Sequence, residues 1–154
     1  IDNISIEQLK GIFTGEIKNW SELGCGDHKI VCVSRDVSSG TFEVFKELVL
    51  DDKTVRDDAL RVNSNQQVAT TVSSTDWSIS YIGLGYLTPK VKALKVDEVE
   101  CSKANAISGD YPILRSLHMY TNGAPKGKVK KYLDYVTSDE GQMLVEEMGF
   151  VPIR

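Results

Sequence analysis

Residues 30–45 read IVCVSRDVSSGTFEVF, and this stretch contains the strand, turn and helix signals that decide the fold. The apolar, β-branched run within residues 29–34 is typical of a buried strand. A Ser-Ser-Gly-Thr turn follows, and a helix is expected to begin near Ser39 with Phe42 and Phe45 on its inner face. A strand that leads directly into a helix is the building unit of α/β proteins.

Similar signals recur along the rest of the chain. Ser5 and Gln8 have the spacing of a capping box, apolar residues then recur at helical spacing until Gly15, and Trp20 is expected to anchor the core. A helical turn is expected over residues 54–60, and further helices over about residues 66–72, 125–136 and 138–148. Further strands are expected over residues 78–84, 91–96 and 111–121. The alternation predicts an α/β fold in which the carboxyl ends of the strands face a ligand crevice.

Length and charge limit the classes of function. At 154 residues the chain is about one domain long, which is enough to bury roughly 68–70% of the surface of the unfolded chain. The net charge of −4 argues against nucleic acid as a partner. The basic run at residues 126–131 includes apolar residues at helical spacing, so we interpret it as the solvated face of a helix.

Cysteine and histidine spacing predicts no metal site. Cys25, Cys32 and Cys101 contain no CxxC pair, and His28 and His118 are far apart in the sequence. One disulfide with one thiol left over is possible, although Cys32 lies in an apolar run where a small buried side chain is expected. The sequence has no signal peptide, no apolar stretch long enough to span a bilayer and no first methionine, so we expect a mature or trimmed segment.

The turn at residues 35–41 has the composition of an anion site. Backbone N–H groups at a helix N-terminus, together with the positive end of the helix dipole, attract anions. Gly40 would allow a ligand close to the backbone, and Ser39 and Thr41 would add hydroxyl donors. Arg35, at the end of the strand, would supply a planar charged fork that matches two oxygens of a tetrahedral oxyanion.

A purely structural interpretation of the same turn remains open. Ser38 or Ser39 would then only cap the helix, and Arg35 would pair with Asp36 or Glu43 at the surface.

Several motifs in order resemble one known family. They are NISIEQLKGIFTG at residues 3–15 with Asn19-Trp20, SRDVSSGTFE at residues 34–43, NSNQQVATTV at residues 63–72, YIGLGYL at residues 81–87, and SDEGQ at residues 138–142 with GFVP at residues 149–152. Together they resemble the substrate-binding protein of bacterial ABC phosphate importers. The resemblance implies a periplasmic-binding-protein-like lobe of type 2, with a mixed sheet flanked by helices, that closes on its ligand by hinge motion.

The resemblance also implies which residues bind the ligand. The second lobe of that family contributes an arginine and a Ser-Gly-Thr turn to phosphate, which match Arg35, Ser39, Gly40 and Thr41. Asp36 directly follows the arginine, whereas some members have an acidic residue two positions after it. Asp36 would either orient Arg35 or point away from the ligand, because a carboxylate that faces a dianion is favourable only if it accepts the proton of the ligand. Asp36 and Ser38 are candidates for residues that support the site without contacting phosphate.

The first lobe of the family contributes a Gly-Ser-Thr/Ser turn, a further serine and an aspartate, and nothing in this chain matches them. The resemblance therefore implies that residues 1–110 are the second ligand-binding lobe. Residues 111–154 would be a C-terminal return segment, a strand and two helices, that packs on the first lobe. A homodimer or an exchange of segments is possible if that surface is uncovered.

The implied partners are inorganic phosphate and the membrane permease of an ABC transporter, without a cofactor. The implied location is extracytoplasmic, with membrane anchoring if the full-length protein is a lipoprotein. Two alternatives are a binding protein for another tetrahedral oxyanion, such as sulfate, and a scaffold or sensor lobe that binds nothing.

An enzyme is not expected. A serine nucleophile at Ser38 or Ser39 would need a base, and neither His28 nor His118 lies in a catalytic motif. The phosphate-loop pattern G-x-x-x-x-G-K-[ST] is absent, which excludes a nucleotide hydrolase of that type.

Overall fold

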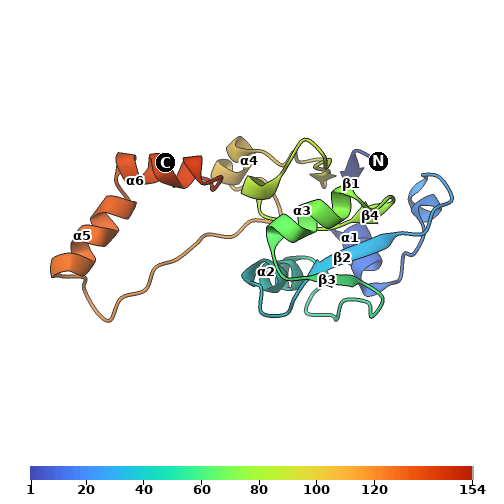
Figure 1. Cartoon of the computed structure of the whole chain (residues 1–154), viewed down its shortest axis with the longest axis horizontal. Helices are drawn as coiled ribbons and strands as arrows, with labels where there is room; N and C mark the ends of the chain where they lie inside the picture. The colour runs from blue at the N-terminus through green and yellow to red at the C-terminus, as the bar shows by residue number, and fades with distance from the viewer. Residues whose placement is uncertain (154) are drawn as a thin grey trace.

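Two small parallel sheets organise the first part of the chain (Figure 1). The computed structural model describes residues 1–153. One sheet pairs β1 (Asn3–Ile4) with β5 (Lys95–Val96), and the other has the order β3-β2-β4. The central strand β2 (Val31–Arg35) pairs in parallel with β3 (Leu60–Val62) and with β4 (Ser78–Ile79). In the described part of the chain, antiparallel pairing is limited to two isolated bridges.

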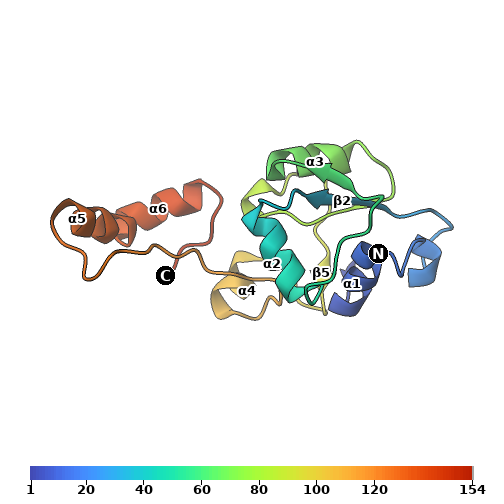
Figure 2. The same ribbon diagram turned by 90° about the horizontal axis from the view of Figure 1, so that it is seen from below.

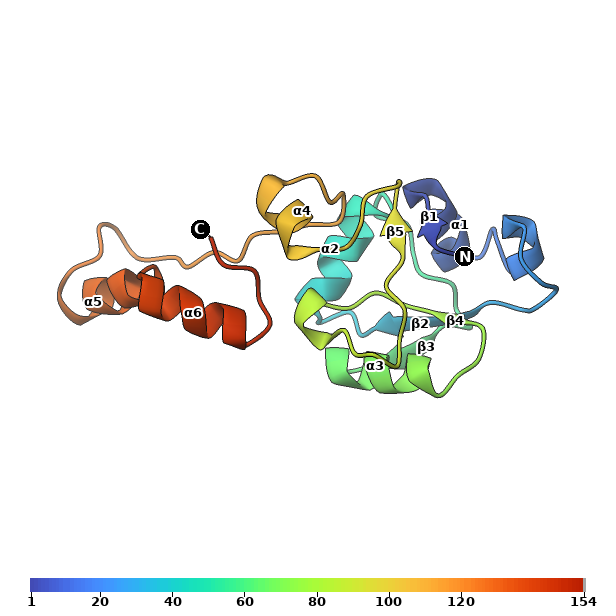
Figure 3. The same cartoon turned by 90° about the horizontal axis from the view of Figure 1, so that it is seen from above.

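Helices lie on both faces of the three-stranded sheet (Figures 2 and 3). They are α2 (Gly40–Leu48) on one face and α3 (Asn65–Ser73) on the other. The helix α1 (Ile6–Thr14) has the predicted capping box of Ser5 and Gln8. Short 3₁₀ helices, η1 (Trp20–Leu23) and η2 (Leu84–Tyr86), complete the body.

The core follows the alternation of side chains along β2, because successive residues of a strand point to opposite faces. Cys32 packs in the larger cluster, which includes Phe13 of α1 and Phe45 of α2. The Phe13 and Phe45 rings meet edge to face at 4.7 Å. Val33 packs on the other face in a smaller cluster with Val62 and Val68. Trp20 is buried, which confirms its predicted place in the core.

The C-terminal helices lie apart from this body (Figure 1). After α4 (Lys103–Ser108), residues 109–126 form no helix or strand and lead to α5 (Gly127–Val136) and α6 (Asp139–Glu147). The end of α6 contacts the first part of the chain, because Nζ of Lys103 in α4 forms an ion pair with Oε1 of Glu146 in α6 at 2.8 Å. The backbones of Gly85 and Gly149 also touch, since a Cβ atom on Gly85 would lie 2.4 Å from the Gly149 oxygen.

Two predicted elements were wrong. Residues 54–59 form an irregular segment with a turn at residues 57–58 instead of a helical turn, and Leu60 begins β3. The parallel pairing of β3 with β2 outweighs the local helical pattern. Residues 111–113 form bends and residues 114–121 are irregular, and no strand of the described chain pairs with them, so they form no sheet. The strands expected at residues 78–84 and 91–96 are shortened to β4 and β5 for the same reason.

The remaining structural expectations concern cysteines and membrane contact. Cys25, Cys32 and Cys101 are all free, so the optional disulfide is not formed. Burial raises the pKa of the Cys32 thiol to about 11, which keeps it protonated and unreactive at neutral pH. Within residues 1–153, no helix has the length and apolar character needed to cross a bilayer.

Candidate functional site

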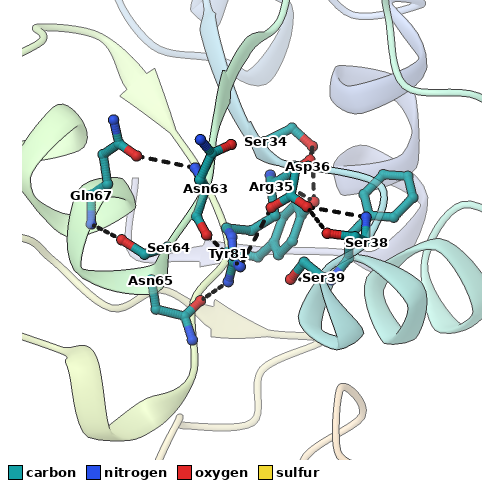
Figure 4. Close-up of polar contacts among 11 residues, drawn as sticks. Ser34, Arg35, Asp36, Ser38, Ser39, Asn63, Ser64, Asn65, Gln67 and Tyr81 are labelled. Atoms are coloured by element: carbon teal, nitrogen blue, oxygen red, sulfur yellow. Dashed lines mark hydrogen bonds and ion pairs between the residues drawn. The ribbon is translucent and has the colours of Figure 1, made fainter.

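The Arg35 side chain is held in place by the segment that enters α3 (Figure 4). Nη1 donates a hydrogen bond to Oδ1 of Asn65 at 2.9 Å, and Nη2 donates to the main-chain oxygen of Asn63 at 3.1 Å. The Arg35 side chain is only 11% exposed, and its bond to Asn63 lies at the solvent-exposed end. The guanidinium group of Arg35 is therefore held in one orientation, with Nη2 at its solvent-exposed end.

The positive charge of Arg35 is only partly neutralised by a carboxylate. The nearest carboxylate oxygen, Oδ2 of Asp36, lies 3.6 Å from Nη2, which is beyond hydrogen-bond distance. The other two contacts of the guanidinium are to neutral oxygens. Nε is buried and has no hydrogen-bond partner within residues 1–153. A mostly buried cation with this environment favours an additional anion.

Asp36 and Ser38 form the loop between β2 and α2. Oδ1 of Asp36 accepts hydrogen bonds from the Ser38 hydroxyl and from the Ser38 N–H, the latter at 3.1 Å. These bonds, chiefly the one from the hydroxyl, lower the pKa of the Asp36 carboxyl below its ordinary value of 3.8. Asp36 is therefore an ionised acceptor at neutral pH, suited to holding the loop and facing Arg35.

The N-terminus of α2 provides the second group of donors. The buried Ser39 is the N-cap, and its hydroxyl oxygen accepts a hydrogen bond from the Phe42 N–H at 3.3 Å. The Glu43 N–H is bonded to the Ser39 main-chain oxygen. The N–H groups of Gly40 and Thr41 have no acceptor within the described residues. They are the free donors expected at the first turn of a helix.

The partly buried Tyr81 supports this arrangement. The Tyr81 ring stacks on Phe45 of α2 with the ring centroids 3.9 Å apart. Its hydroxyl contacts the Ser34 hydroxyl at 2.8 Å and accepts a hydrogen bond from the Arg35 N–H at 3.2 Å. Burial raises the pKa of the Tyr81 hydroxyl. Tyr81 thus joins the end of β2 to the inner face of α2.

The predicted residues are brought together at one end of the sheet. Arg35 ends β2, and Ser39, Gly40 and Thr41 begin α2. Ser39 does cap the helix, and Arg35 does face Asp36, but Arg35 lies mostly buried and not at the surface. Asn63, Asn65 and Tyr81 were missed as contributors because their sequence positions gave no sign of contact with Arg35. Only their place in the family motifs singled them out.

The two histidines lie elsewhere. His28 stacks on Trp77 with the ring centroids 3.5 Å apart, before the start of β2, whereas Arg35 lies at its other end. His118 lies beside Tyr120, with 6.4 Å between the rings. Neither histidine forms a hydrogen bond with Ser38 or Ser39 in the described chain, so the geometry provides no histidine base for these hydroxyls. The grouped donors can bind an anion.

Comparison with protein families supports the class of the fold. The family model described as a PBP superfamily domain matches residues 1–140. The chain therefore belongs to the PBP superfamily, and the predicted periplasmic-binding-protein-like fold of type 2 is confirmed.

Within this superfamily the chain is similar to phosphate-binding proteins, as its motifs predicted. It is 39% identical over 155 aligned positions to the phosphate-binding protein PstS of Bacillus subtilis, and 37% identical to that of Borreliella burgdorferi. These alignments cover 99% and 100% of the chain but only 51% and 60% of the two relatives. The chain thus spans little more than half the length of these curated relatives.

Solved structures give the same result. The crystal structure of PstS from Borrelia burgdorferi matches with a TM-score of 0.82 and 38% identity, over 100% of this chain and 65% of that one. A protein from Clostridium perfringens, described as a phosphate ABC transporter substrate-binding protein with bound phosphate, matches with a TM-score of 0.87 and 29% identity. That match covers 100% of this chain and 64% of the other.

Proposed function

We propose that this chain is the second lobe of a phosphate-binding protein and that Arg35 and the N-terminus of α2 hold one side of the anion. The observation that carries the proposal is a guanidinium held by two hydrogen bonds at the end of β2, followed after a short loop by a helix whose first two N–H groups have no acceptor in the described chain. Charged donors, helix N–H groups and the helix dipole all favour the same ligand, a compact oxyanion.

Phosphate is the preferred oxyanion because relatives that align with almost the whole chain are named phosphate-binding proteins. Ser39, Gly40 and Thr41 would donate hydrogen bonds to phosphate oxygens, with Arg35 supplying the charge. Asn63 and Asn65 would fix the direction of the guanidinium, and Asp36 with Ser38 would hold the loop. The protein is a binding protein and not an enzyme in this proposal.

The binding site would be completed by a first lobe. Residues 1–110 would form the second lobe, and residues 111–154 would pack on the first lobe through their exposed apolar side chains. The assembled protein would act outside the cytoplasm and deliver phosphate to an ABC permease. The chain alone would bind phosphate weakly, because half of the donors belong to the other lobe.

Proton–nitrogen NMR can detect such weak binding in this chain. Phosphate in the millimolar range should shift the backbone amide signals of Gly40 and Thr41 in a saturable way, at constant ionic strength. The Arg35→Ala variant should lose the saturable shift. The amide of Glu7 provides a matched comparison, because α1 is also a nine-residue helix with a serine cap but has no such arginine. The Ile6 N–H is not used, because it already donates a hydrogen bond to Oδ1 of Asp97 at 3.2 Å.

The competing hypotheses give different outcomes in the same titration. Equal saturable shifts with sulfate would favour a less selective oxyanion site. Shifts at Gly40 and Thr41 no larger than that at Glu7, with either anion, would contradict the proposal and favour a scaffold. Submicromolar binding by the chain as a monomer would contradict the requirement for a first lobe.

A further inference from the structure

A second arginine lies against the first residue of α2. If Gly40 carried a Cβ atom, that atom would lie 2.7 Å from Nη2 of Arg115, 3.2 Å from Nη1 and 3.4 Å from Cζ. The Arg115 guanidinium therefore packs directly on the Gly40 backbone. Arg115 belongs to residues 109–126, the segment that joins α4 to the C-terminal helices.

The Arg115 guanidinium has no protein counter-charge. Within residues 1–153 it forms no ion pair with a carboxylate and donates no hydrogen bond. The carboxylate of the loop before α2, that of Asp36, is already bonded to Ser38 and faces Arg35. A cation at the positive end of a helix is repelled by the helix dipole. An anion bound between the helix N–H groups and the guanidinium would attract both and offset this repulsion.

The Gly40 N–H and Thr41 N–H are free donors at the same place. The turn therefore gathers unpaired N–H groups from α2, the guanidinium of Arg35 and the guanidinium of Arg115 from a different part of the chain. An exposed arginine without a partner gains little from the bare protein surface. Its position is best explained by a ligand with at least two negative charges.

We propose that Arg115 is a second arginine of the anion site, supplied by the segment at residues 109–126. This inference rests on the proposed function and deepens it. The ligand is a doubly charged tetrahedral oxyanion, which binds to α2 on one side and to the connecting segment on the other. The bound anion thereby links the segment at residues 109–126, which leads to the C-terminal helices, to the body that contains β2.

Arginine side-chain NMR tests the inference on the chain itself. The Nε–H signals of Arg35, Arg115 and Arg56 are assigned from Arg→Lys variants and followed during a phosphate titration. The Arg115 signal should shift with the same midpoint as the Gly40 amide. Arg56 serves as the reference, because its guanidinium is bound to Asp58 near Lys29, before the start of β2.

Variants of Arg115 should change the affinity without changing the fold. Arg115→Gln should weaken phosphate binding about fivefold to tenfold, on the scale of one lost hydrogen-bonded contact at an exposed position. Arg115→Lys should recover part of that loss. Lys128→Gln removes the same charge from exposed α5 and should leave phosphate affinity unchanged.

The outcomes separate this inference from the proposed function. If Gly40 and Arg35 respond to phosphate while the Arg115 signal does not move and Arg115→Gln binds as well as the unmodified chain, the inference is overturned and the proposed function stands. If neither Gly40 nor Arg115 responds, both are overturned. Equal weakening by Arg115→Gln and Lys128→Gln would reduce the role of Arg115 to general charge and would also overturn the inference.

Discussion

At the scale of single residues, the site depends on how Arg35 is held. Its guanidinium donates to a side-chain oxygen of Asn65 and to a main-chain oxygen of Asn63, so two neighbours set its direction. The rigid fork of arginine is useful for oxyanion binding only when that direction is fixed.

Asn65→Ala should therefore weaken phosphate binding although Asn65 is not proposed to touch the ligand. The loss of one hydrogen bond leaves Nη1 without its acceptor and lets the guanidinium turn. The affinity measured by NMR titration should fall, with the largest change in the Arg35 Nε–H signal. Gln66→Ala, one position further on the same helix and exposed, is the control. An unchanged affinity in Asn65→Ala would show that Asn63 alone is sufficient.

Gly40→Ala should separate stability from binding. The new Cβ atom would collide with the Arg115 guanidinium, which is the mobile end of a long side chain and can move away. Alanine also favours a helix more than glycine does. Thermal unfolding should thus occur at the same or a slightly higher temperature, while phosphate affinity falls. A clear loss of thermal stability would contradict this account of Gly40.

At the scale of elements, α2 is held by its cap. Ser39→Ala should lower the free energy of unfolding by about 1 kcal/mol, the usual cost of losing an N-cap side chain, and should also weaken phosphate binding. Ser138→Ala removes the equivalent cap of α6, so it should affect stability but not affinity. Denaturant unfolding and NMR titration of both variants provide the comparison. Equal phosphate affinity in the two variants would contradict a role for Ser39 in binding.

The turn that precedes β3 should make stability depend on pH. Asp58 Oδ2 accepts a hydrogen bond from Nη2 of Arg56 at 2.8 Å, and this pairing lowers the pKa of Asp58 from 3.8 to about 2. Because the pKa is depressed in the folded state, the stabilisation is complete above the unfolded pKa and is lost as the pH falls toward the folded pKa.

Asp58→Asn should thus lower the melting temperature at neutral pH. The difference from the unmodified chain should shrink as the pH falls from about 4 to about 2. Asp57→Asn is the matched control, because Asp57 is exposed and adjacent. A difference in melting temperature that stays constant through this range would exclude the ion pair as its cause.

The elements show why some features could be predicted from the sequence. The capped helices α1, α2 and α3 were predicted because caps and apolar spacing act within a few residues. Residues 111–121 were wrongly predicted as a strand because a strand also needs a partner, and none pairs with them in the described chain. Asn65 was missed for a related reason, since its contact with Arg35 exists only after β2 and α3 come together.

At the scale of the whole molecule, the C-terminal part contains an unusual amount of exposed apolar surface. α5 has no buried residue. The large exposed apolar residues from position 114 onward are Leu114, Leu117, Met119, Tyr120, Val129, Tyr132, Tyr135, Met143, Leu144, Met148, Phe150 and Ile153. Exposed apolar surface on this scale is typical of a region that packs on another unit.

The isolated chain should therefore self-associate through its C-terminal helices. Light scattering during gel filtration should show a molecular mass that rises with concentration. Val129→Glu combined with Met148→Glu should keep the chain monomeric by placing charge on α5 and at the C-cap of α6. Ile107→Glu changes an exposed apolar residue of α4 and is the control. A monomer at all concentrations would contradict the need for this surface to be covered.

We propose that Arg35, with the N-terminus of α2, binds phosphate in the assembled protein. Calorimetric titration of this chain completed by a first lobe tests the role of Arg35 by comparing Arg35→Ala with Lys18→Ala. Lys18→Ala removes the same charge before the start of β2 and should bind phosphate normally. Arg35→Ala should bind phosphate more weakly by over about 2 kcal/mol, the scale for truncating one partner of a buried charged contact. Unchanged phosphate affinity in Arg35→Ala would contradict the claim.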